Sequence, residues 1–285
     1  MAEPLTQQYE KLRIIYSEIV NGYTYDEERN IYVKHLSERE NGELSRKRQS
    51  LFLKLKKEGV PSEQEKLQQV IDAEMWSTEK EEEILQHKYI ILDNEKNLEK
   101  IIPQQHGPIL KIIEQTKEKL GELLYERRQV VGITAEECAE KDSSLFLFHL
   151  CFFTDPKLET RLFPSYSDTD ELEDQQISDY SRLIESMYKK FNEETLKKVA
   201  IMPFFMNYYI NCKDKVHTFF GKPIVDLTSF QLHLISLGNR NINILEQSKG
   251  EPPEIMGDIK IEDVINWYDQ EYSLILGRRN LSKSV

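Results

Sequence analysis

One segment of the sequence constrains the fold more than any other. Its side chains recur at alternating intervals of four and three residues, as in a helix that lies along a partner helix. The residues at these positions are Ile109, Ile113, Thr116, Leu120, Leu123, Arg127 and Val130. Before the break at 101–108, Ile84, Ile91 and Leu98 repeat every seven residues. The two patterns together predict an antiparallel helical hairpin over residues 77–131.

Helix signals also flank this hairpin. Apolar spacing predicts helices over 5–20 and 31–57. Two pairs, Ser62 with Glu65 and Thr134 with Glu137, have the spacing of a capping box and predict further helix starts, the second for a helix over 135–153. The N-terminal part, residues 1–155, is therefore expected to be helical.

The C-terminal part, residues 156–285, has a more mixed pattern. Helical periodicity resumes at Ile177, but Pro203 excludes a continuous helix interior in the aromatic run that follows residue 200. Residues 216–227 predict irregular or short-strand structure. A helix is expected from Thr228 to Leu237, closed by Gly238, and a last one over 261–276. We predict a mostly α protein whose N-terminal helices pack on an aromatic-rich C-terminal domain with at most a short β element.

Charge and cysteine content limit the class of protein. The net charge of −12 argues against a protein that coats nucleic acid. Lysines and arginines at 46–57 are flanked by Glu and Gln and predict an exposed helix face, with a nucleic-acid contact as the alternative.

The longest apolar stretch, Leu145–Phe153, is about half the ~20 residues of a membrane span. With three widely spaced cysteines and no signal peptide, we expect a cytoplasmic protein without a membrane segment.

Motifs for catalysis are missing from the sequence. It contains neither the glycine-rich phosphate loops nor the Gly-x-Ser-x-Gly and His-Glu-x-x-His patterns. His149 and Cys151 are too close on one helix to share a face, and Cys138 lies three turns away, so a buried thiol and a core histidine are preferred over a zinc site. The acidic runs 79–83 and 168–174 lack the glycine of a calcium loop. We predict no catalytic residue, no metal ligand and no cofactor.

One alternative interpretation of the sequence is an enzyme with a Cys/His pair. Cys212 with His217 could pair a nucleophile with a base, provided that the fold brings the two side chains together.

Aromatic residues crowd the C-terminal third of the chain. Such side chains dominate packing when they are buried, and they are also enriched where proteins dock. The aromatic residues therefore have two interpretations, a buried core and a surface that binds a partner, and the two can coexist. The candidate partner-binding residues are Phe204, Phe205, Tyr208, Tyr209, Phe219, Phe220 and Trp267.

The segment Phe219–Thr228, followed by Phe230-Gln231, Leu237-Gly238 and Trp267-Tyr268, resembles proteins of tailed bacteriophages. The resemblance covers about residues 219–268 and is to virion-assembly proteins, including tail-assembly chaperones. It implies an acidic, helix-rich, non-catalytic protein that acts in the host cytoplasm or in the virion, and no functional residue carries over from it.

These observations lead to one expected function with two alternatives. We expect a non-enzymatic assembly or structural protein that binds a protein partner, such as another virion component, through a helical scaffold and an aromatic surface. The first alternative is a homo-oligomeric structural subunit of a virion or other complex. The second is an enzyme with a Cys/His site near Cys212.

Overall fold

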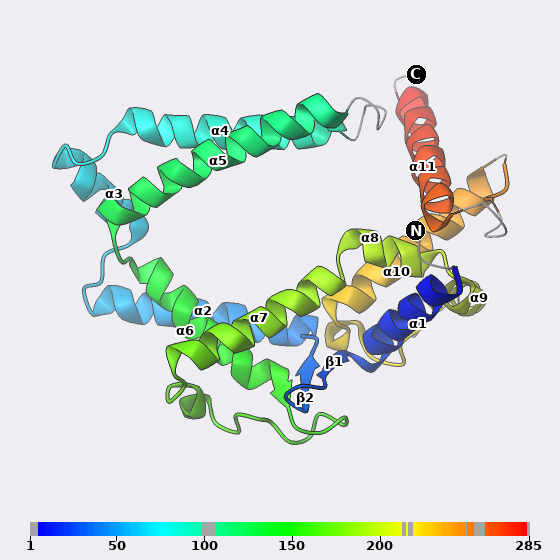
Figure 1. The fold of residues 1–285 in the computed structure, drawn as a ribbon, viewed down its shortest axis with the longest axis horizontal. Helices are drawn as coiled ribbons and strands as arrows, with labels where there is room; N and C mark the ends of the chain where they lie inside the picture. The colour runs from blue at the N-terminus through cyan, green and yellow to red at the C-terminus, as the bar shows by residue number, and fades with distance from the viewer. Residues whose placement is uncertain are drawn as a thin grey trace. The chain divides into compact units, whose positions relative to one another are not determined.

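The computed structural model describes residues 5–98, 106–212, 215, 219–248, 250–253 and 260–283. Over these residues the chain is mostly helical with one small antiparallel sheet, as predicted. It forms two compact units, drawn in Figure 1. Unit 1 comprises Met1–Arg46 and Ser144–Val285, and unit 2 comprises Lys47–Ser143.

These bounds differ from the regions 1–155 and 156–285 expected from the sequence. The reason is where the apolar side chains are buried. Leu12 and Ile19, near the start of the chain, belong to the same hydrophobic cluster as Leu234 and Ile265. An N-terminal segment thus contributes to the core of the C-terminal helices.

Unit 2 contains α3 (Glu63–Asp72), α4 (Thr78–Leu98) and α5 (His106–Val131), with the adjoining parts of α2 (Glu38–Lys57) and α6 (Ala135–Cys151). Helices α4 and α5 lie side by side (Figure 1). Their ion pairs, Lys80–Glu126 and Glu95–Lys117, are both 2.8 Å long and show that the two helices run antiparallel. The predicted hairpin is confirmed.

The seam between the two helices follows the predicted pattern. Ile84, Ile113 and Thr116 are buried, and the other predicted seam positions are half-buried. At the end of the hairpin near α3, a small core closes the unit, formed by Val70, Trp76, Ile84 and Val131. The Ser62 capping box that starts α3 is present as predicted.

Unit 1 contains the remaining elements: α1 (Leu5–Asn21), β1 (Tyr23–Asp26), β2 (Ile31–Lys34), β3 (Phe152–Phe153), η2 (Tyr166–Thr169), α7 (Asp174–Lys190), α8 (Glu193–Ala200), α9 (Pro203–Asn211), η4 (Ile224–Asp226), α10 (Ser229–Gln247) and α11 (Ile261–Lys283). The short helix α8 packs against α1, α10 and α11. Its buried face is Leu196, Val199 and Ala200.

A buried polar contact fastens α1 to α10. The side chain of Gln231, fully buried, donates to the backbone carbonyl of Ile19 at 2.8 Å. The same side chain accepts from the backbone N–H of Thr228 and completes the cap of α10. A buried amide must find such partners, so Gln231 fixes where α1 lies on α10.

The helix expected over 31–57 is wrong in its first residues. Residues 31–34 form β2, which pairs antiparallel with β1 and β3. Ile31 and Val33 are buried while Tyr32 and Lys34 are half-buried, the alternation of a strand. The helix starts only at Glu38.

Pro203 interrupts the aromatic run as predicted, whereas the helix end predicted at Gly238 is wrong. Helix α9 begins at Pro203 itself, because a proline at the first helical position leaves no N–H unpaired. Gly238 does not close α10, which continues to Gln247. That glycine is needed instead for close packing, since a Cβ there would lie 2.5 Å from the ring of Tyr209.

Of the two alternatives predicted for residues 216–227, irregular or short-strand structure, the irregular one holds for the residues that the structure describes. Residues 216–218 are outside the described part of the chain, and 219–227 form turns and the single 3₁₀ turn η4.

Candidate partner-binding surface

Helix α9 divides the predicted aromatic residues between its two faces. Phe205 and Tyr209 are fully buried, with their rings stacked at 5.0 Å. The hydroxyl of Tyr209 donates to the carbonyl of Ile235 at 2.8 Å, and burial raises the pKa of Tyr209. For these two residues the core alternative holds, and their rings are not presented to a partner.

Phe219 and Phe220 are half-buried beside this core. Phe219 lies 5.6 Å from the ring of Phe205 and 5.2 Å from that of Tyr209. Phe220 meets Phe219 edge-on at 4.8 Å. Phe219 thus packs on the inner pair, and Phe220 packs on Phe219.

Trp267 is not brought together with the other six residues. It lies half-buried on α11, where its ring contacts that of Tyr268 at 5.0 Å. Both belong to a separate cluster with Ile244, Val264 and Ile275.

The outer face of α9 is different. Phe204, Tyr208 and Cys212 follow one another at intervals of four residues, so they share one face of the helix. Phe204 and Cys212 are half-buried, whereas Tyr208 is 67% exposed. Beneath them, the stacked inner rings hold the helix in place.

Two tyrosines of α1 adjoin this face. The ring of Tyr9 meets that of Phe204 edge-on at 5.2 Å, and the ring of Tyr16 lies 5.3 Å from it. We call Tyr9, Tyr16, Phe204 and Tyr208 the aromatic surface. It joins two of the predicted partner-binding residues, Phe204 and Tyr208, to two residues of α1 that were not among the predicted ones.

Hydroxyl groups give the aromatic surface a polar component. Burial raises the pKa of Tyr16, and the neighbouring Tyr208 and Cys212 raise it further. The Tyr16 hydroxyl is therefore protonated at neutral pH and able to donate a hydrogen bond. In the described part of the chain, no hydrogen bond uses the hydroxyls of Tyr9, Tyr16 or Tyr208. Rings with such polar ends suit a protein interface.

The possible reactive groups have ordinary structural surroundings where they are described. His149 bonds through Nδ1 to the carbonyl of Phe163 at 2.8 Å, and its Nε2 faces the guanidinium of Arg161. Cys151 is buried, which raises the pKa of its thiol. Of the pair Cys212 and His217, the histidine lies outside the described residues. Among the residues that are described, no group of three or more His, Cys, Asp or Glu is placed to hold a metal ion.

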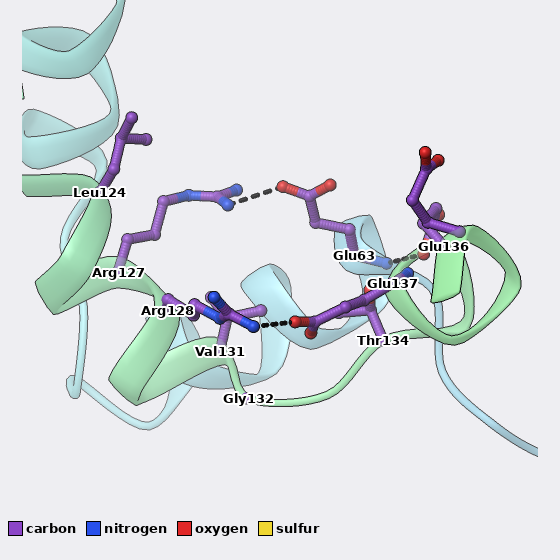
Figure 2. A pocket seen from close by; sticks show the side chains of 10 residues that line it. Glu63, Leu124, Arg127, Arg128, Val131, Gly132, Thr134, Glu136 and Glu137 are labelled. Atoms are coloured by element: carbon purple, nitrogen blue, oxygen red, sulfur yellow. Dashed lines mark hydrogen bonds and ion pairs between the residues drawn. The ribbon is translucent and has the colours of Figure 1, made fainter. Parts of the chain in front are cut away.

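A hollow of about 360 Å³ in unit 2 is lined by charged groups that bind one another (Figure 2). Arg127 donates to Glu63 at 2.6 Å and to Glu81 at 2.7 Å. Burial lowers the pKa of Arg127, but these two carboxylates outweigh it, and the pKa is raised. Arg128 pairs with Glu137 across the same hollow. These charged side chains are therefore already paired with one another. The two ion pairs of Arg127 link α5 to α3 and α4, and we call Arg127, Glu63 and Glu81 the charged clamp.

No family model, curated protein or solved structure matches this chain. Within the described ranges, none of the helices is long and apolar enough to cross a membrane.

Proposed function

We propose that this protein is non-enzymatic and binds a protein partner through the aromatic surface. The observation that supports the proposal is the exposure of Tyr208 beside rings that the core holds rigid. A rigid aromatic side chain loses little conformational entropy on binding, which is why tyrosine is common among the residues that contribute most to interfaces.

The proposal extends to virion assembly on the resemblance of residues 219–268 alone. In that setting the partner is another virion component, held before or after it is built in. The helices then serve as the scaffold that keeps Tyr9 and Tyr16 of α1 against Phe204 of α9, one turn before Tyr208.

The test compares two tyrosines of equal exposure. Tyr208→Ala removes the most exposed ring of the aromatic surface, whereas Tyr125→Ala removes a tyrosine of α5 that is also 67% exposed. The wild-type protein and both variants are used to capture partners from the native source, with circular dichroism as the check on folding. We expect a partner that both the wild type and Tyr125→Ala retain. This partner should bind Tyr208→Ala about 30-fold more weakly than it binds the wild type, which is the effect of a typical interface hot spot.

The result that contradicts the proposal is equally clear. If Tyr208→Ala and Tyr125→Ala retain the same proteins with the same affinity, the aromatic surface is not the binding site. Phe219→Ala is not a suitable probe, because its ring packs on Phe205 and Tyr209 and its loss would disturb the core.

A further inference from the structure

The outer face of α4 carries an apolar stripe that its own hairpin leaves uncovered. Leu85, Tyr89 and Leu92 are spaced by four and three residues, so they lie on one face of the helix. They are 53%, 69% and 48% exposed. The seam with α5 uses other positions, among them the buried Ile84, which lies on a different side of α4.

One charged residue continues the stripe at each end. Glu82 precedes Leu85 by three residues, and Lys96 follows Leu92 by four, so both fall on the same face. Both side chains are exposed. No ion pair within the described part of the chain involves either of them. We call Glu82, Leu85, Tyr89, Leu92 and Lys96 the α4 stripe.

The order of residues in the α4 stripe makes it complementary to itself. When two such helices pack antiparallel with Tyr89 opposite Tyr89, Leu85 of one copy faces Leu92 of the other. Glu82 then faces Lys96 of the second copy, and the same pair forms again at the other end. Parallel packing would instead place Glu82 against Glu82 and Lys96 against Lys96, which like-charge repulsion disfavours.

We propose that two copies of this chain associate through the α4 stripe, with their α4 helices antiparallel and a two-fold axis at Tyr89. A two-fold contact uses the same surface on both copies, and the stripe has the self-complementary sequence that this requires. The inference goes beyond the proposed function, because the stripe belongs to unit 2 and the aromatic surface to unit 1.

The size of the contact sets the strength of the dimer. Residues 82–96 span about 21 Å of helix at 1.5 Å per residue. A contact made by one such stretch of helix from each copy should bury less than the roughly 1,200–2,000 Å² of stable complexes. We therefore expect a dissociation constant in the micromolar range.

Charge reversal tests the pairing directly. Sedimentation velocity of the full chain from about 5 to 200 µM should show a reversible monomer–dimer equilibrium. Glu82→Lys and Lys96→Glu should each weaken it about tenfold, because each change creates two like-charge pairs per dimer. The double variant should restore it, since the pairs are re-formed with their signs exchanged. Glu118→Lys, the same charge change at an exposed position of α5, should leave it unaltered.

Either of two results would overturn the proposal. One is a wild-type protein that stays monomeric over the whole concentration range. The other is a double variant no better than the single ones, which would mean that the two charges do not face each other. Neither result bears on partner capture by Tyr208, so the two proposals fail separately.

A cross-link locates the two-fold axis. Tyr89→Cys, in a chain with Cys138 and Cys212 changed to serine, should form a disulfide-linked dimer under mild oxidation. Tyr125→Cys is the matched control, because Tyr125 lies on the neighbouring helix and is 67% exposed, close to the 69% of Tyr89. Equal dimer yields from the two variants would contradict an axis at Tyr89.

Discussion

At the scale of single residues, Gly238 lies inside α10 and makes room for the ring of Tyr209. Phe205 and Tyr209 were candidates for a partner surface and are core. In each case the deciding contact is with a residue distant in the sequence.

The close approach at Gly238 gives the first prediction. Gly238→Ala should lower the free energy of unfolding by about 1–3 kcal/mol, because a new Cβ would collide with the Tyr209 ring. Gly121→Ala, in the interior of α5 with open space around the glycine, should instead raise it by about 0.5–1 kcal/mol. Urea unfolding of both variants checks this, and equal effects would contradict the packing explanation.

A buried histidine gives the second prediction. His35 lies edge-on to the rings of Phe191 and Phe230, and its Nε2 lies 3.0 Å from the hydroxyl of Thr24. Burial, with a smaller effect from Lys190, lowers the pKa of His35 to about 3. Below pH 6.5 the unfolded chain therefore binds a proton that the folded chain excludes.

Stability should accordingly fall as the pH drops from about 6 to 4. His35 contributes about 1.4 kcal/mol per pH unit to that slope. His35→Gln should flatten the plot of unfolding free energy against pH by this amount, whereas His233→Gln, at an exposed position of α10, should not. Parallel plots for the wild type and His35→Gln would contradict the low pKa.

At the scale of elements, prediction succeeded where a pattern was long. The α4–α5 hairpin repeats its spacing over many turns, so few other structures fit it. The strands β1 and β2 have four residues each, too few for their alternation to stand out from a helical pattern. The pairing of Tyr9 and Tyr16 with α9 could not be predicted, because nothing local in the sequence links residues almost 200 positions apart.

The charged clamp of unit 2 gives the third prediction. Arg127→Ala should lower the free energy of unfolding by about 1–3 kcal/mol, because it leaves Glu63 and Glu81 without their shared partner. Arg128→Ala is the control: this neighbour is 73% exposed and pairs with one carboxylate, so its loss should cost at most about 1 kcal/mol. Denaturant unfolding measures both, and equal losses would mean that the clamp has no special role.

At the scale of the whole molecule, unit 2 is inserted into unit 1. Its two ends lie close together, since Arg48 donates to Glu140 at 2.7 Å and to the hydroxyl of Ser143 at 3.4 Å. Each hydrophobic cluster consists of residues from a single unit.

This arrangement gives the fourth prediction. A chain in which residues 47–143 are replaced by a short Gly/Ser linker should still fold, because the core of unit 1 loses no buried side chain. Near-ultraviolet circular dichroism should retain the signal of its aromatic core, and unfolding should be cooperative. A shortened chain without that signal would show that unit 1 depends on the inserted segment.

The hydrogen bond from Gln231 to Ile19 has a consequence during protein synthesis. The two residues are 212 positions apart, so at about 5–20 residues per second the ribosome needs roughly 10–40 s to supply the second after the first. Throughout that interval the apolar face of α1 lacks the contacts that it makes with α8 and α10, whereas both helices of the α4–α5 hairpin have already been synthesised. The nascent chain therefore completes its middle first and joins its beginning to its end last.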